Sequence, residues 1–137
     1  MCRQGASVIQ TAVLEAIEDP SLRVCVVWVP MLPEDQSVQA QEASCLVSDQ
    51  RASHFWDAER VLPTLFSSVL NLSSGYPAWD VYLAYPPGTR WDDEPARPLY
   101  WQHQLGGLAV APQLDGETLA AHVRLILASR QEERRNG

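Results

Sequence analysis

Lysine is absent from this chain of 137 residues, and arginine supplies all ten of its basic side chains. The absence of lysine excludes Schiff-base catalysis and any phosphate-binding loop that depends on a lysine. The chain has a net charge of −7 and a pI near 4.8, which argues against binding to nucleic-acid phosphates or to anionic lipid. The sequence therefore predicts neither a nucleic-acid partner nor a membrane partner.

Long hydrophobic runs are also lacking. The longest, at 24–32, is far shorter than the ~20 residues of a membrane-spanning helix. The first twenty residues include Glu15, Glu18 and Asp19 and show no charged-then-apolar signal pattern. A cytoplasmic location is therefore expected.

Cysteine is scarce, and Cys2, Cys25 and Cys45 form no Cys-x-x-Cys pair. An odd number of cysteines without an export signal predicts no disulfide framework. The three histidines show no metal-ligand spacing, so no metal and no other cofactor is expected. Cys25 lies in a β-branched apolar run, which predicts a buried side chain.

The length and a hydrophobic content of 46% suit one globular domain, expected over 1–137. Apolar residues alternate between helical and strand spacing along it. We expect an N-terminal helix at 7–19 with Ser7 as its N-cap, a core at 22–128 and a frayed tail at 129–137. The other expected elements are a strand at 22–29, a helix at 34–49, a strand at 52–56, a helix at 62–70, strands at 79–85 and 99–104, and a last helix from 115.

This order predicts an α/β fold with one mixed, four-stranded sheet and helices on both faces. The strands at 22–29 and 52–56 are parallel, because a right-handed crossover helix joins them. The strands at 79–85 and 99–104 form an antiparallel hairpin. The continuous apolar run at 22–29 indicates a central strand that is covered on both faces.

The order of elements over 22–128 resembles the thioredoxin fold. The strand Val24-Cys25-Val26-Val27-Trp28 leads into a turn and a helix, as does the strand before a thioredoxin redox loop. Tyr76-Pro77 precedes the strand at 79–85, where such proteins carry a cis-proline. The resemblance implies a thioredoxin-like three-layer sandwich and a cis peptide bond at Pro77.

The redox cysteines of that fold are missing here. The corresponding segment reads Val29-Pro30-Met31-Leu32-Pro33-Glu34-Asp35, so Leu32 and Asp35 stand where the thiols would be. Dithiol exchange needs an attacking thiolate and a resolving thiol. The sequence therefore predicts a redox-inactive binding or interaction module rather than an enzyme.

The loops at 30–35 and 76–79 are the predicted binding site, because open α/β sheets bind ligands at the carboxyl ends of their strands. Methionine and aromatic side chains there suit a protein segment or a small apolar ligand. The alternative is that Met31 and Leu32 cover the core and that the acids belong to a helix start. The candidate binding residues are Pro30, Met31, Leu32, Glu34, Asp35, Tyr76, Pro77 and Trp79.

Two alternatives involve other chemistry. Cys45 could be the reactive thiol of a single-thiol oxidoreductase or peroxidase, or it could bind a soft metal together with a histidine. Against the peroxidase, Cys45 lies beyond the first turn of its predicted helix, where the helix dipole no longer acts on the thiol. His54 and Asp57 could form an acid–base pair, or they could be a hydrogen-bonded strand histidine and a turn residue. The sequence assigns no catalytic residue.

Five tryptophans are many for this length. Trp91, in the predicted hairpin turn, and Trp101 are candidates for an interface, since indole side chains give large contact areas. A homodimer that packs through this hairpin is the expected form of self-association.

Overall fold

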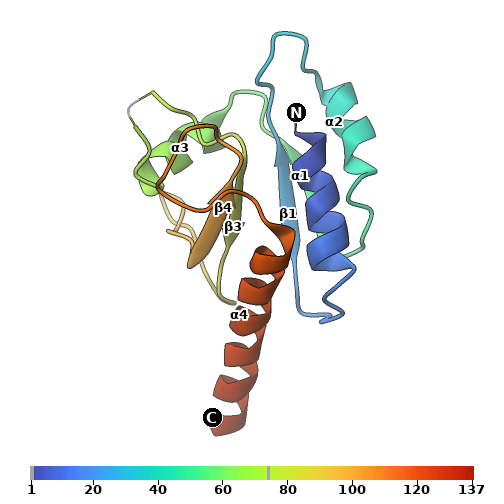
Figure 1. The fold of residues 1–137 in the computed structure, drawn as a ribbon, viewed down its shortest axis with the longest axis vertical. Coiled ribbons are helices and arrows are strands. Elements are labelled where there is room, and N and C mark those ends of the chain that lie inside the picture. Colours follow the sequence, from blue (N-terminus) through green and yellow to red (C-terminus); the bar gives the residue numbers. More distant parts are fainter. Residues whose placement is uncertain (1, 74) are drawn as a thin grey trace.

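The computed structural model describes residues 2–73 and 75–137, which form four α-helices, one π-helical turn and four strands (Figure 1). The mixed α/β class and the predicted alternation of elements are confirmed. In chain order the elements are α1 (Arg3–Val8), η1 (Ile9–Leu14), β1 (Val24–Trp28), α2 (Ser37–Ser44), β2 (Ala52–Trp56), α3 (Val61–Val69), β3 (Val81–Ala84), β4 (Tyr100–His103) and α4 (Gly116–Asn136).

The four strands form two separate sheets. β1 and β2 are parallel, with Val24 opposite Ala52, and β3 and β4 are antiparallel, with Val81 opposite His103. Both predicted pairings are confirmed. The prediction of a single four-stranded sheet was wrong for the described residues, which form two two-stranded sheets.

α1 and η1 follow each other without a break, and we term them together the first helix. The first helix and α2 cover one face of the β1–β2 pair (Figure 1). Trp28 packs there with Leu14, Ala43 and other buried side chains. The helix begins earlier than predicted, because the Cys2 thiol caps it by accepting from the Gly5 N–H at 3.4 Å. Ser7 lies inside the helix, where its hydroxyl donates to the Arg3 carbonyl oxygen.

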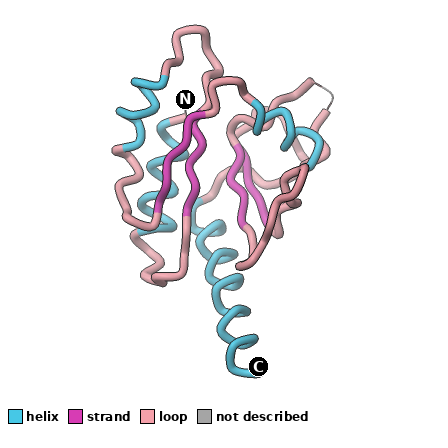
Figure 2. Tube along the Cα trace, turned by 180° about the vertical axis from the view of Figure 1, so that it is seen from behind, coloured by secondary structure: helices cyan, strands magenta, loops and turns pink. Residues whose placement is uncertain are grey.

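The opposite face of the β1–β2 pair is open. Seen from behind, no helix lies in front of these two strands (Figure 2), and Cys25, Ser53 and Phe55 are exposed. The predictions of a strand covered on both faces and of a buried Cys25 were therefore wrong. The physical reason is that α3 packs against the other sheet, where Phe66 and Leu70 join its core.

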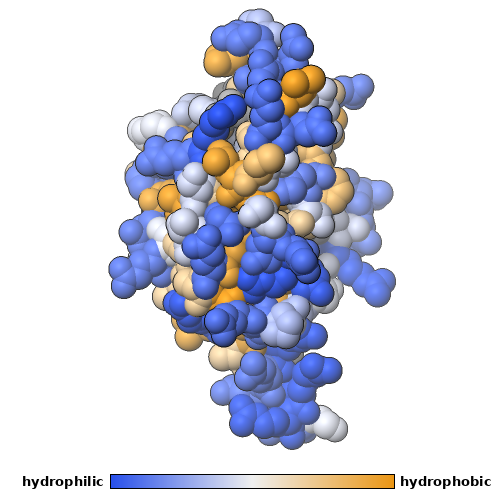
Figure 3. Space-filling view, turned by 90° about the vertical axis from the view of Figure 1, so that its right-hand side faces the viewer, coloured by the Kyte–Doolittle hydropathy of each residue, from blue (hydrophilic) through white to orange (hydrophobic). Residues whose placement is uncertain are grey.

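α4 packs against η1 through a second core that includes Val13, Ile17 and Leu119. Its N-cap is Asp115, whose carboxylate accepts from the Thr118 N–H at 2.8 Å. The helix continues through 129–136, where the sequence predicted fraying, because arginine, glutamine and glutamate favour helices. Its projecting end is hydrophilic (Figure 3).

Among the described residues, no helix combines the length and apolar character needed to cross a bilayer.

Arg51 ties the end of the first helix to the start of β2. Its guanidinium donates to the carbonyl oxygens of Leu14 and Ile17, which the helix itself leaves without donors. Asp49 holds the guanidinium in place, with Nη2 and Oδ2 2.7 Å apart. This ion pair therefore fixes the position of the first helix relative to the parallel sheet.

The Asp49–Arg51 pair predicts a loss of stability in acid. Hydrogen bonds from Arg51 lower the pKa of Asp49 to about 2. A carboxyl whose pKa is lower in the folded state stabilises the fold above its unfolded pKa, and this contribution disappears as the pH falls through the folded value. We expect urea unfolding midpoints to fall between about pH 4 and about pH 2, and to fall less in Asp49→Asn than in the wild type. An equal fall in both proteins would contradict this assignment.

Candidate functional site

A cavity of about 710 Å³ lies between β1 and β3, and every residue of both strands lines it. We term it the interstrand groove. Side chains from the first helix, α3 and α4 complete its walls, among them Ile9, Phe66 and Leu127. Most of the lining residues are apolar, so the groove offers a contact surface to an apolar ligand.

The free edge of β1 faces this groove. Residues of a strand direct their backbone groups to alternate edges. The Val24 N–H donates to the Arg51 carbonyl oxygen at 3.0 Å, and the Trp28 carbonyl accepts from the Asp57 N–H at 3.0 Å, so these residues face β2. Cys25 and Val27 therefore direct their backbone N–H and C=O groups away from β2, towards the groove.

The free edge of β3 faces the groove from the other side. The Asp80 carbonyl accepts from the Gln104 N–H at 3.0 Å. Asp80 and every second residue after it therefore direct their backbone groups towards β4. Val81 and Leu83 consequently direct their backbone groups towards β1. No backbone hydrogen bond joins β1 to β3 within the described part of the chain. Two rows of backbone donors and acceptors thus flank an apolar space.

At one end of the groove lies a second cavity of about 490 Å³, lined by Cys2, Met31, Leu32, Trp79 and Asp80. We term this end the mouth. Four of its five residues also line the larger cavity, so the two cavities adjoin each other. Leu32 is 55% exposed and Trp79 is 38% exposed, which leaves both apolar side chains accessible at the mouth.

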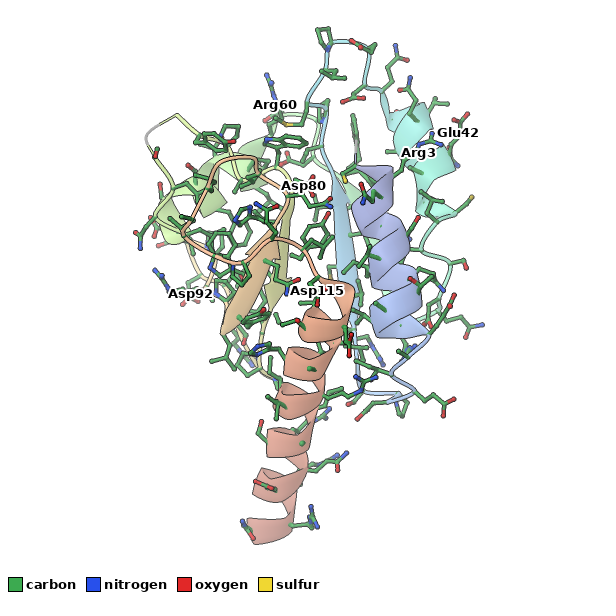
Figure 4. All side chains as sticks on the ribbon, in the orientation of Figure 1. Arg3, Glu42, Arg60, Asp80, Asp92 and Asp115 are labelled. Carbon is green, nitrogen blue, oxygen red and sulfur yellow. The ribbon has the colours of Figure 1, made fainter. Side chains whose placement is uncertain are left out.

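A small polar cluster lies at the inner side of the mouth. Asp80 is only 6% exposed, and its Oδ1 accepts from the Tyr82 hydroxyl at 2.5 Å. The Cys2 thiol donates to Gln104 Oε1 at 3.0 Å. Burial, and then the bond to the Asp80 carboxylate, raise the pKa of Tyr82 well above its usual range. Tyr82 therefore stays protonated and holds Asp80 between the β3–β4 pair and the first helix (Figure 4).

Three of the eight candidate binding residues meet at the mouth: Met31, Leu32 and Trp79. They come from two loops that are distant in the sequence. The other five candidates line neither cavity. These are Pro30, Glu34, Asp35, Tyr76 and Pro77.

Asp35 and Tyr76 have structural contacts instead. The Asp35 carboxylate accepts from the N–H groups of Leu32 and Met31, both at 2.9 Å, and these bonds lower its pKa. It therefore closes the turn that presents Leu32 and Met31 at the mouth. The Tyr76 carbonyl accepts from the Ser67 hydroxyl at 2.5 Å.

No cis peptide bond occurs in the described residues, so the prediction of a cis bond before Pro77 was wrong.

The proposed His54–Asp57 pair does not form. His54 Nδ1 accepts from the Trp28 indole N–H at 3.1 Å, and its Nε2 lies 2.9 Å from the Val47 carbonyl oxygen. The Asp57 carboxylate accepts from the N–H groups of Val61 and Leu62 at the start of α3. Both ring nitrogens of His54 and both oxygens of Asp57 thus have structural partners.

Cys45 follows the last residue of α2 and is exposed, as is Cys25. All three cysteines are free thiols. In the part of the chain that is described, no group of three or more histidine, cysteine or acidic side chains could hold a metal ion.

The two tryptophans proposed for an interface have intramolecular contacts. The Trp91 ring packs edge-on against Phe66, with ring centroids 5.5 Å apart, while 46% of the residue stays exposed. Trp101 packs against the core beneath α3. Both rings help to cover the hydrophobic core next to the groove.

The prediction from sequence did not include Cys2, Asp80 and Tyr82 in the site. A signal was present, because an acid and a tyrosine two residues apart in a strand lie on the same face. An acid placed there indicates either an exposed face or a specific buried partner. The structure shows the second case, with Tyr82 as the partner.

Comparisons with protein-family models, with curated proteins and with solved structures found no match for this chain.

Proposed function

We propose that this protein is a redox-inactive, thioredoxin-like binding module that takes an extended, mostly apolar peptide segment into the interstrand groove. One observation carries the proposal: an apolar cavity of about 710 Å³ lies between two strand edges that share no backbone hydrogen bond. A bound strand supplies both the apolar side chains and the backbone groups that these edges require.

The order of the strands supports a thioredoxin-like arrangement. β2 pairs with β1, β3 pairs with β4, and β1 and β3 line the same groove. In the proposed arrangement the two separate sheets face each other in the order β2-β1 and β3-β4, with the groove between β1 and β3. A segment bound between β1 and β3 joins the two pairs into one sheet.

The absence of paired thiols supports a binding role without redox chemistry. Leu32 and Asp35 occupy the positions at which a thioredoxin carries its cysteines. The chain's own three cysteines are free: Cys2 precedes α1, Cys25 lies in β1 and Cys45 follows α2. We therefore expect no acceleration of insulin reduction by dithiothreitol.

The size of the groove suits a short extended segment. Ligand sites typically occupy ~300–1,000 Å³, and the groove falls within this range. β1 has five residues, which at ~3.3 Å per residue span roughly 16 Å. The groove is therefore long enough for about five residues of a bound strand.

Fluorescence anisotropy with a labelled peptide tests this proposal. We expect saturable binding of a peptide of about ten alternating valine and serine residues, which favours an extended strand. A matched peptide with prolines in alternate positions should bind at least about tenfold more weakly, because proline lacks the backbone N–H. Equal binding of the two peptides, or no binding of either, would overturn the proposal.

A pair of double variants locates the binding site. Met31→Ser combined with Leu32→Ser should weaken binding by about tenfold, because it removes apolar contact area at the mouth. Leu99→Ser combined with Leu125→Ser is the control, since each of these residues is 66% exposed and neither lines a cavity. Equal affinities of the two double variants would place the binding site elsewhere.

A further inference from the structure

Asp80 is a buried carboxylate that has no counter-ion among the described side chains. It is 6% exposed, and no arginine of the described residues forms an ion pair with it. Acidic side chains are almost never so deeply buried unless they are paired. Its hydrogen-bond donor is the hydroxyl of Tyr82, so no cationic side chain among the described residues pairs with the carboxylate.

The second oxygen of this carboxylate is available to a ligand. Oδ1 accepts from Tyr82, and no described residue donates to Oδ2. Among the described side chains, no nitrogen or oxygen shielded from solvent lacks a hydrogen-bond partner. Oδ2 is therefore not fully shielded from solvent, and Asp80 is a lining residue of both cavities.

The surroundings favour a cationic ligand group. The chain has a net charge of −7 and contains no lysine. Near Asp80 the mouth presents Met31, Leu32 and Trp79, whose apolar surfaces exclude water around an ion pair. A guanidinium or ammonium group donates to a carboxylate with a charge-assisted hydrogen bond, which is stronger than a neutral one.

We infer that the interstrand groove selects a peptide segment with one arginine or lysine among apolar residues, and that Asp80 binds this cation. The inference rests on the proposed peptide-binding function and specifies its partner. Asp80 directly precedes β3 and lies at the mouth. The cation therefore belongs near one end of the bound segment, and apolar residues follow it along the groove.

The test compares two labelled peptides that differ in one side chain. One is the valine–serine peptide with an arginine near one end, and the other has citrulline there, which keeps the shape without the charge. We expect the wild-type protein to bind the arginine peptide about tenfold more tightly. Asp80→Asn should reduce this ratio to about one. Asp92→Asn makes the same charge change at an exposed residue that lines neither cavity, and it should preserve the ratio.

The dependence of binding on salt distinguishes a partly buried ion pair with Asp80 from a general attraction of the cationic peptide to an acidic protein. Raising the ionic strength from about 0.05 to about 0.5 M screens exposed charges strongly and partly buried pairs much less. The arginine preference of the wild type should therefore persist, which tests the inference even if Asp80→Asn folds poorly. Equal binding of the two peptides, or loss of the preference in salt, would overturn the role of Asp80 while leaving the proposed function in place. If neither peptide binds, the proposed function itself fails.

Discussion

Replacement of Gly5 by valine should lower the free energy of unfolding by about 3 kcal/mol. A Cβ atom at this position would lie 1.7 Å from the Tyr82 hydroxyl oxygen and 2.6 Å from Cζ. Tyr82 cannot easily move aside, because it is partly buried and its hydroxyl donates a hydrogen bond to the Asp80 carboxylate at 2.5 Å. Gly5 is thus required for close packing of the first helix against β3.

The matched control is Gly106→Val. A Cβ at Gly106 meets no atom within 4 Å, so this variant should change stability by less than about 0.5 kcal/mol. The free energy of unfolding of both variants is measured by urea unfolding, which is monitored by tryptophan fluorescence. Equal stabilities would show that Tyr82 does not pack on Gly5. Gly5→Val should also weaken the arginine preference in peptide binding, since a displaced Tyr82 releases Asp80.

Replacement of His103 by leucine should also cost about 3 kcal/mol of unfolding free energy. His103 is fully buried. Its Nδ1 accepts from the Leu105 N–H at 3.0 Å, and its Nε2 lies 2.9 Å from the Ala111 carbonyl oxygen. The first bond requires a neutral ring with its proton on Nε2, which then donates to Ala111. Leucine offers neither bond, so it leaves a buried N–H and a buried C=O without partners.

His122→Leu is the control for this substitution. His122 stacks on Tyr100, with ring centroids 3.5 Å apart, and is only partly buried. Its replacement by leucine retains apolar contact and should cost less than about 1 kcal/mol. If the two histidine variants unfold at the same urea concentration, the buried hydrogen bonds of His103 do not stabilise the loop that follows β4.

Features set by neighbouring residues could be predicted from the sequence. The limits of β2 agree with the predicted strand at 52–56, because an alternating run between a helix and a turn is a local pattern. Asp115 was expected at the start of the last helix, and it is the N-cap of α4, since an aspartate there accepts from backbone N–H groups of the first turn. The meeting of Met31, Leu32 and Trp79 followed from the order of the elements.

Features that depend on distant parts of the chain were decided only in the tertiary structure. The apolar run of β1 is compatible with a central strand and equally with a strand beside an apolar groove, because both surround it with hydrophobic side chains. Whether β1 pairs with β3 depends on where α3 and α4 pack, and α3 packs over the β3–β4 pair. The burial of Asp80 against Tyr82 depends on the same packing. Local spacing thus determined the elements and the apolar end of the site, whereas long-range packing created the groove and placed a carboxylate in it.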